Sequence, residues 1–227
     1  MIAKALEHNG AKVYIIGRRL EVLEKAALQA VRQSSNPSEF LLKKREIIPL
    51  QGDLTIKEDL SRIVDTITAS DGYINLLIAN AGISGPGSFS EFTNTYAVNT
   101  SAIFFAVIAF LNPLEAGNQR GNVEQKSQVI ASSGLGAHNR LAMAGYAYSI
   151  SKAAVTHMMK QFATSLHLMG LEAIWPIAKL SLEDGIPAGV IPPRGPGMIQ
   201  DMSGAILYMT SKAGGYLNGN VSSYRRW

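Results

Sequence analysis

Short apolar runs alternate with longer amphipathic stretches along most of this 227-residue chain. Runs rich in β-branched and aromatic residues predict strands, and stretches with apolar residues at every third or fourth position predict helices. We expect strands at 13–16, 46–50, 74–79 and 128–131, and helices at 1–9, 19–33, 57–69, 91–111 and 146–169. Beyond Gly170 the less regular pattern predicts a shortened strand at 171–176, a helix at 201–212 and a last strand at 216–221.

This alternation of strands and helices predicts the fold class. Strand–helix–strand units with short connections form parallel sheets with right-handed crossovers and helices on both faces. We therefore expect a single α/β domain over residues 1–227, with three layers and a doubly wound, mostly parallel sheet of the Rossmann type. In such sheets ligands bind beyond the carboxyl ends of the strands, so polar residues at those positions are candidates for the functional site.

Composition excludes several kinds of site. The chain contains no cysteine, so it has no disulfide, thiolate zinc site or cysteine nucleophile, which agrees with a cytoplasmic protein. His138, His157 and His167 match no metal-ligand spacing, and we expect no metal. The net charge is +4, but the basic residues are scattered, which argues against nucleic-acid binding. The most apolar run, 101–111, is too short to cross a bilayer, so we expect no membrane contact.

Tyr148 and Lys152 lie four residues apart in the helix predicted at 146–169. At this spacing both side chains lie on one face of the helix and can reach a common ligand. A phenol has an unperturbed pKa of about 10, and a nearby cation lowers that pKa toward the range useful for acid–base catalysis. The pair therefore predicts a proton donor for carbonyl reduction. With eight tyrosines in the chain, the same spacing also arises by chance on a surface helix.

Several polar residues accompany this pair. Ser133 follows the strand at 128–131, where its hydroxyl can bond a substrate oxygen. Asn99 lies inside the apolar helix at 91–111, where a polar amide either serves a site or bends the helix and binds water. The turn at 80–82 (Asn-Ala-Gly) follows another strand, and its glycine either lets the backbone approach a cofactor or forms an ordinary tight turn.

A further polar turn, Gly52-Asp53-Leu54, follows the strand at 46–50. The carboxylate of Asp53 is suited to accept a hydrogen bond from an adenine amino group. The same residue type also caps helix N-termini, and a helix is predicted to begin shortly after this turn. Both interpretations place Asp53 at the carboxyl end of a strand.

Taken together, these motifs resemble those of the classical short-chain dehydrogenase/reductase family. The similarity includes Asn-Ala-Gly at 80–82, Val-Asn at 98–99, Ser-Ser-x-x-Gly at 132–136 and Tyr-x-x-x-Lys at 148–152, in the family's order and near its spacings. It covers roughly residues 1–170, and the tail at 201–221 is also similar. The segment 145–165 resembles fungal reductases akin to 3-oxoacyl reductases of the rhamnolipid type.

The resemblance implies a catalytic tetrad of Asn99, Ser133, Tyr148 and Lys152. Tyr148 would exchange the proton, Ser133 would hold the substrate oxygen, Lys152 would bind the nicotinamide ribose and favour the phenolate, and Asn99 would hold a water in a proton relay. The implied substrate is a small molecule with a carbonyl or alcohol group. The family pairs its subunits through the helices that correspond to 91–111 and 146–169, which implies a homodimer or homotetramer.

The choice between NAD and NADP depends on the residues that follow the strand at 13–16. Enzymes that use NAD place an acidic residue there to bond the ribose 2′-hydroxyl, whereas this chain has Gly17-Arg18-Arg19. A guanidinium suits a 2′-phosphate, so we expect NADP(H), although an arginine pair also suits the start of a solvated helix. The expected cofactor-binding residues are Arg18, Asp53, Leu54, Asn80, Ala81, Gly82, Tyr148 and Lys152.

The sequence departs from the family in two places. The family opens with a strand and the glycine-rich turn Thr-Gly-x-x-x-Gly-x-Gly, which receives the pyrophosphate, whereas Met1 lies in the helix that follows that turn. We therefore expect an N-terminally incomplete fold with unpaired backbone groups beside the absent central strand. After Gly170, the family's strand and Pro-Gly turn are shortened or lacking. These departures support an alternative, a catalytically impaired relic that binds nucleotide weakly or serves as an oligomer partner.

Overall fold

The structure is a computed structural model that describes residues 1–32, 46–84, 87–138, 140, 142, 144–174, 199–214 and 217–218. Its strands are β1 (Val13–Gly17), β2 (Ile47–Gln51), β3 (Leu76–Ala79), β4 (Gln128–Ala131) and β5 (Glu172–Ile174). Its α-helices are α1 (Ile2–His8), α2 (Leu20–Arg32), α4 (Lys57–Asp71), α5 (Phe89–Tyr96), α6 (Ala102–Ala109), α7 (Leu111–Arg120), α8 (Tyr146–His167) and α9 (Ile199–Thr210). Shorter helical turns are η1 (Ala97–Ser101), η2 (Leu135–Ala137) and η5 (Lys212–Gly214).

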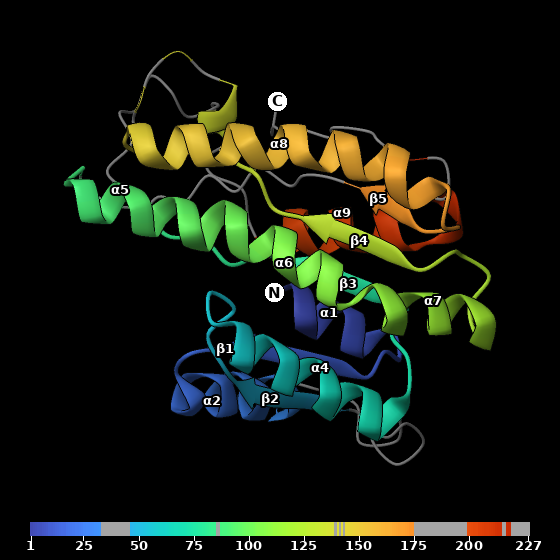
Figure 1. Ribbon diagram of the computed structural model, residues 1–227. Helices are drawn as coiled ribbons and strands as arrows, with labels where there is room; N and C mark the ends of the chain where they lie inside the picture. The colour runs from blue at the N-terminus through green and yellow to red at the C-terminus, as the bar shows by residue number, and fades with distance from the viewer. Residues whose placement is uncertain are drawn as a thin grey trace.

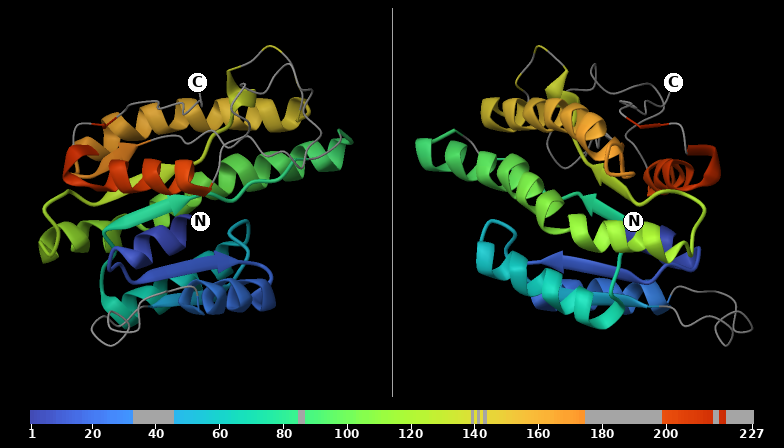
Figure 2. Two further views of the ribbon diagram at one scale, coloured as in Figure 1. Left: turned by 180° about the vertical axis from the view of Figure 1, so that it is seen from behind. Right: turned by 45° about the vertical axis from the view of Figure 1, so that its right-hand side comes forward.

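The elements form three layers, which confirms the predicted doubly wound α/β fold. Helices α4, α5, α6, α7 and α8 lie on one side of the strands, and α1, α2 and α9 lie on the other (Figures 1 and 2). Every strand pair is parallel. The larger apolar core lies between the strands and the first helix layer, and includes Ile63, Val107, Leu114, Val155 and Met159, all essentially inaccessible to solvent.

The strands form two sheets among the described residues. One sheet contains β1 and β2, and the other contains β3, β4 and β5 in that order. Strands β1 and β3 are apolar throughout, yet every residue in them is only partly buried, whereas all four residues of β4 are buried. Strand β4 is therefore covered on both faces by the described residues, whereas β1 and β3 are covered less completely.

Side-chain packing holds the two sheets together. Tyr14 and Ile16 of β1 pack on the same core cluster as Leu77 and Ala79 of β3. Helix α4, which follows β2, packs against α6, which follows β3. The relative position of the two sheets therefore depends on apolar contacts and on helix packing.

The helix predicted at 91–111 is interrupted. Helix α5 begins with a capping box in which Ser88 Oγ accepts a hydrogen bond from the Glu91 backbone N–H and the Glu91 carboxylate accepts one from the Ser88 N–H. The wide turn η1, a π-helix, separates α5 from α6. Single π-turns within α-helices frequently mark functional sites, and this one contains Asn99. Helix α7 was not predicted, and the strand predicted at 216–221 lies almost wholly outside the described residues.

One helical stretch is apolar enough to be considered as a membrane span. The stretch Phe89–Ala109 has the length and apolarity to cross a bilayer, with a mean hydropathy of 1.2 over its 18-residue window. One third of that window is buried within the protein, and Asn99 in its middle is fully buried. Core helices of soluble proteins share this composition, so the stretch by itself does not indicate a membrane-spanning segment.

Candidate active site

The predicted site residues lie at the carboxyl ends of the strands. Strands β1 and β3 point in the same direction in both views of Figure 2, so the ends of all five strands lie on the same side of the molecule. Arg18 follows β1, Asp53 follows β2, Asn80 follows β3 and Ser133 follows β4. The fold therefore places residues that are far apart in the sequence along one edge, as expected for a ligand site in a doubly wound fold.

Tyr148 lies in the first turn of α8 and is half-buried. A Cβ atom added to Gly134 would lie 2.7 Å from the Tyr148 hydroxyl oxygen, so the phenol rests directly against the backbone that follows β4. The Nζ of Lys152 lies 5.9 Å from the centroid of the Tyr148 ring. Helical spacing therefore brings the phenol and the ammonium together, as the sequence predicts.

Lys152 is almost completely buried, with 3% of the residue exposed. Its Nζ donates a hydrogen bond to the carbonyl oxygen of Ser132, at 2.8 Å. A Cβ atom added to Gly82 would lie 3.2 Å from this Nζ, so the glycine allows the turn after β3 to approach the lysine closely. Burial disfavours the charged form and lowers the pKa of Lys152 from 10.5 to about 8.

The two serines after β4 have different surroundings. Ser132 Oγ donates to Asn80 Oδ1 at 2.7 Å and links the turns after β3 and β4. Ser133 is also buried, but its hydroxyl donates to the Lys152 carbonyl oxygen at 3.0 Å and lies 2.9 Å from the Thr156 hydroxyl. In this arrangement the Ser133 hydroxyl is bonded to the backbone and to a side chain of α8.

Asn99 connects the π-turn to the loop after β3. Its Oδ1 accepts a hydrogen bond from the Ile83 N–H at 2.8 Å, and its Nδ2 donates to the Ile83 carbonyl at 2.9 Å and to Ser151 Oγ at 3.0 Å. Both N–H groups of the amide therefore donate hydrogen bonds, so this fully buried side chain has no unpaired donor. The amide fixes the loop that contains Asn80, Ala81 and Gly82, all of which are exposed at the site.

The residues predicted to bind the adenosine half of the cofactor form a separate group in the β1–β2 sheet. Arg18 NH1 lies 3.9 Å from a carboxylate oxygen of Asp53. Both residues line a cavity of about 370 Å³. Leu54, by contrast, packs against the apolar core. Two groups therefore exist, one around Arg18 and Asp53 and the other around Tyr148 and Lys152.

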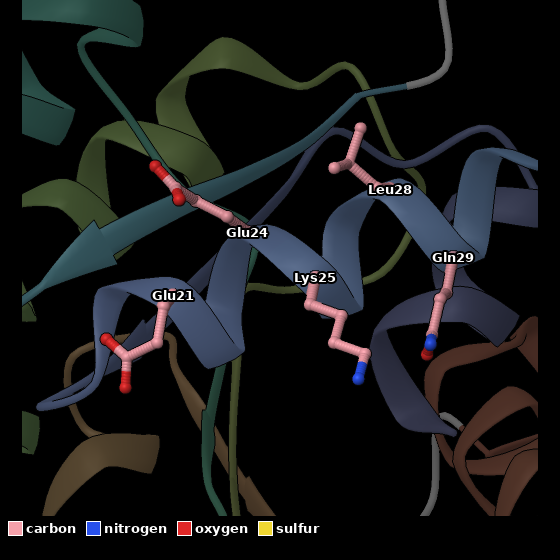
Figure 3. A pocket seen from close by; sticks show the side chains of 5 residues that line it. All are labelled: Glu21, Glu24, Lys25, Leu28 and Gln29. Carbon is pink, nitrogen blue, oxygen red and sulfur yellow. The ribbon is translucent and has the colours of Figure 1, made fainter.

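A second hollow, of about 330 Å³, lies on α2 and is shown in Figure 3. Its lining consists of Glu21, Glu24, Lys25, Leu28 and Gln29. All five side chains come from this one amphipathic helix and combine opposite charges with an exposed leucine. The hollow therefore lacks the convergent polar groups of a binding site.

Comparison with known proteins identifies the family of this chain. Residues 1–175 match the family profile described as short chain dehydrogenase. The chain belongs to the short-chain dehydrogenase family. The short-chain dehydrogenase/reductase PhomF′ of Diaporthe leptostromiformis is 45% identical over an alignment of 258 positions. The alignment covers 97% of this chain and 84% of that protein. VdtF of Byssochlamys spectabilis, also a short-chain dehydrogenase/reductase, is 35% identical, covering 97% and 85%.

Solved structures resemble the fold of this short-chain dehydrogenase over nearly its whole length. The RhlG/NADP active-site complex of Pseudomonas aeruginosa aligns with a TM-score of 0.83 at 19% identity, covering 99% of this chain and 89% of that one. A 7α-hydroxysteroid dehydrogenase complexed with NADH and 7-oxoglycochenodeoxycholic acid aligns with a TM-score of 0.78 at 22% identity, covering 98% and 86%. These likenesses support the fold.

Sequence reasoning did not identify several residues that shape the site of this short-chain dehydrogenase. Thr156 and Ser151 bond the predicted residues Ser133 and Asn99 from the next turns of α8. Asp59 and Arg62 of α4 line the cavity with Arg18 and Asp53. Their spacing, three residues apart in the first turns of α4, indicates an ion pair, but no sequence signal connects that pair to the site.

The buried Lys152 predicts how stability depends on pH. Its folded pKa of about 8 lies below its unfolded value of 10.5, so the unfolded chain binds more protons between these values. Its contribution to the free energy of unfolding therefore rises by about 2 kcal/mol from pH 7.5 to pH 9.5. In urea denaturation at both pH values, the difference between wild type and Lys152→Met should change by this amount. Parallel stability curves for the two proteins would contradict it.

Proposed function

We propose that this chain is an NADP(H)-dependent oxidoreductase that interconverts a ketone and a secondary alcohol, with Tyr148 as the general acid and base. The observation that carries the proposal is the close grouping of Tyr148, the buried Lys152 and the glycines Gly82 and Gly134 at the carboxyl ends of β3 and β4. Gly82, which lacks a Cβ, lets the backbone after β3 lie close to the Lys152 ammonium, and glycine is typical where a backbone also approaches a ligand closely. The cofactor, when bound, supplies the hydride.

Side chains of the protein carry out the proton transfer. Tyr148 donates it to the carbonyl oxygen in reduction and accepts it in alcohol oxidation. Lys152 is protonated at neutral pH, because its pKa is about 8, and its charge favours the phenolate form that remains after proton transfer. Burial keeps water away from this ammonium and strengthens its effect on the neighbouring phenol.

Ser133 and Asn99 complete the proposed tetrad. The Ser133 hydroxyl must turn away from Thr156 about its Cα–Cβ bond to bond the substrate oxygen, and side-chain rotations of this kind are fast compared with turnover. Because both N–H groups of the Asn99 amide are engaged, the relay water is bound by the backbone of the π-turn, while the side chain holds the loop after β3 in place.

NADP(H) is proposed over NAD(H) because of Arg18. No acidic residue lies directly after β1, where a carboxylate would bond the ribose 2′-hydroxyl, and Arg18 lines the cavity at this position. Asn80, Ala81 and Gly82 would border the ribose from the turn after β3. Two of the structurally similar proteins are described as complexes with NADP, and a third as a complex with NADH.

Tyr148→Phe should remove turnover and leave the fold intact, because it deletes one hydroxyl from a half-buried ring. We expect at least a ~100-fold loss of NADPH oxidation with a panel of small ketones, since general acid–base catalysis contributes on that scale. Tyr146→Phe is the matched control, because this neighbouring tyrosine on α8 is 76% exposed. Unchanged turnover in Tyr148→Phe would rule out its role as general acid.

A second candidate function is favoured by the break between the two sheets. The β1–β2 sheet carries Arg18 and Asp53, and the other carries the catalytic group, with no strand between β1 and β3 in the described residues. This separation of Arg18 and Asp53 from the catalytic group supports a catalytically impaired relic that binds nucleotide weakly or serves as an oligomer partner.

Titration of NADPH into the purified protein, followed by calorimetry, separates the two functions. The oxidoreductase predicts saturable binding with a Kd in the micromolar range, in line with the usual KM of enzymes. Binding that does not saturate below millimolar NADPH would favour the relic. Lys152→Met should weaken NADPH binding in the first case and have no effect in the second.

We also propose a homodimer formed through α5, α6 and α8, acting on a small-molecule substrate in the cytoplasm. Exposed aromatic and aliphatic side chains of Phe104, Phe105 and Ile108 lie together on α6, and Phe104 stacks on Phe162 of α8. An apolar patch of this kind marks an association surface.

Phe105→Glu should therefore shift the protein toward monomer in size-exclusion chromatography with light scattering, because a carboxylate is costly to bury in an apolar interface. Leu28→Glu is the control, since Leu28 is equally exposed (58% against 56%) but lies on α2. The same mass for Phe105→Glu and wild type would contradict an interface at this position.

A further inference from the structure

A continuous set of hydrogen bonds surrounds the turn after β2. The Asp59 carboxylate accepts from the Asp53 backbone N–H through Oδ2, at 2.8 Å, and from Arg62 NH2 through Oδ1, at 2.7 Å. Arg62 NH2 also donates to the carbonyl of Gln51, at 2.9 Å. The Gln51 side chain in turn donates to the Arg18 carbonyl, at 3.0 Å. The ends of β1 and β2 are therefore tied to the first turns of α4.

Two further hydrogen bonds within this turn, both from Thr55, orient the carboxylate of Asp53. Its Oδ1 accepts from both the backbone N–H and the hydroxyl of Thr55, at 3.0 and 2.7 Å. This fixes the rotamer, so Oδ2 is the oxygen that lies toward Arg18, at 3.9 Å, beside the cavity. One oxygen of Asp53 is thus used by the turn, and the other is directed to the site.

The Asp59–Arg62 pair contributes little to stability. Its side chains are 31% and 54% exposed, and ion pairs exposed to this extent add little to the free energy of unfolding. Arg62 keeps the pKa of Asp59 below its usual value, so the carboxylate remains a full acceptor at neutral pH. The pair instead fixes the conformation of the turn. The Asp59 carboxylate bonds the Asp53 backbone and the Arg62 guanidinium, and the guanidinium bonds the Gln51 carbonyl.

We propose that Asp59, held by Arg62, is the positioning residue of the nucleotide site: it fixes the turn so that Asp53 Oδ2 accepts from the 6-amino group of the cofactor's adenine. The inference rests on the proposed function and deepens it, since it names the residue that sets purine selectivity. Arg62 is not a ligand of the 2′-phosphate, because Asp59 lies 2.7 Å from its NH2 and would repel an anion there.

The test compares AMP with IMP, which carries a 6-oxo group in place of the 6-amino group. A carboxylate acceptor favours AMP, because the 6-oxo group of IMP repels it. With a correctly placed Asp53, calorimetry of the wild-type protein should show AMP binding about tenfold more tightly than IMP, the effect of one well-formed hydrogen bond.

Asp59→Asn cannot accept from both partners with the same strength and should lower AMP affinity about tenfold, with the AMP-to-IMP ratio falling toward one. The Kd of NADPH should rise by a similar factor. Arg62→Gln should reproduce these shifts, and the double variant should be no worse than either, because both act through one network. Asp65→Asn, an exposed carboxylate on the same helix, is the control and should bind as wild type does.

Two results would overturn the inference. In the first, Asp59→Asn keeps the wild-type ratio of AMP to IMP affinity, whether or not both affinities fall, which leaves the pair a structural role only. In the second, the wild-type protein does not distinguish AMP from IMP. If the wild type binds AMP selectively and Asp59→Asn loses that selectivity while no ketone is reduced, the inference holds and the proposed oxidoreductase activity fails. The two proposals are therefore tested separately.

Discussion

Apolar side chains carry the connection between the two halves of the candidate site, because strand β1 forms no ladder with β3 in the described part of the chain. Tyr14 and Ile16 on one side, with Leu77 and Ala79 on the other, share one core cluster, and α4 packs on α6 across the same break. Arg18 and Asp53 lie in the first half, and Tyr148 and Lys152 in the second. A dinucleotide that contacts both halves therefore depends on non-directional packing to keep them in register.

Within the second half, the site is organised around a buried cation. Lys152 bonds the carbonyl after β4, lies against Gly82 and faces the Tyr148 ring, so one side chain connects β3, β4 and α8. Burial makes this charge costly, and it also makes the charge effective, since the low local dielectric strengthens its action on the phenol. The hydrogen bonds of Asn99 and Ser132 fix the loops on either side of it.

Much of the fold and many of the candidate site residues follow from local patterns. Strands β1 to β4 and helices α2, α4, α8 and α9 match predicted segments, because apolar periodicity directly reflects which face of an element is buried. The π-turn at Asn99 could not be predicted, since its wide hydrogen bonding depends on the loop that Asn99 contacts. The Ser133 hydroxyl direction depends on Thr156, 23 residues away, and no local pattern reports such a contact.

By itself, the sequence determined the α/β class, the family and the polar residues at the strand ends, because strand–helix alternation and short motifs are local features of a chain. Only the tertiary structure decided that the strands form two sheets, that Lys152 is buried with a lowered pKa, and that Asp59 and Arg62 support the Asp53 turn. Each of these depends on the positions of groups brought together by packing. The environment of a side chain is set by its neighbours in space. The sequence lists the residues of the chain, but only the folded structure shows which of them become neighbours.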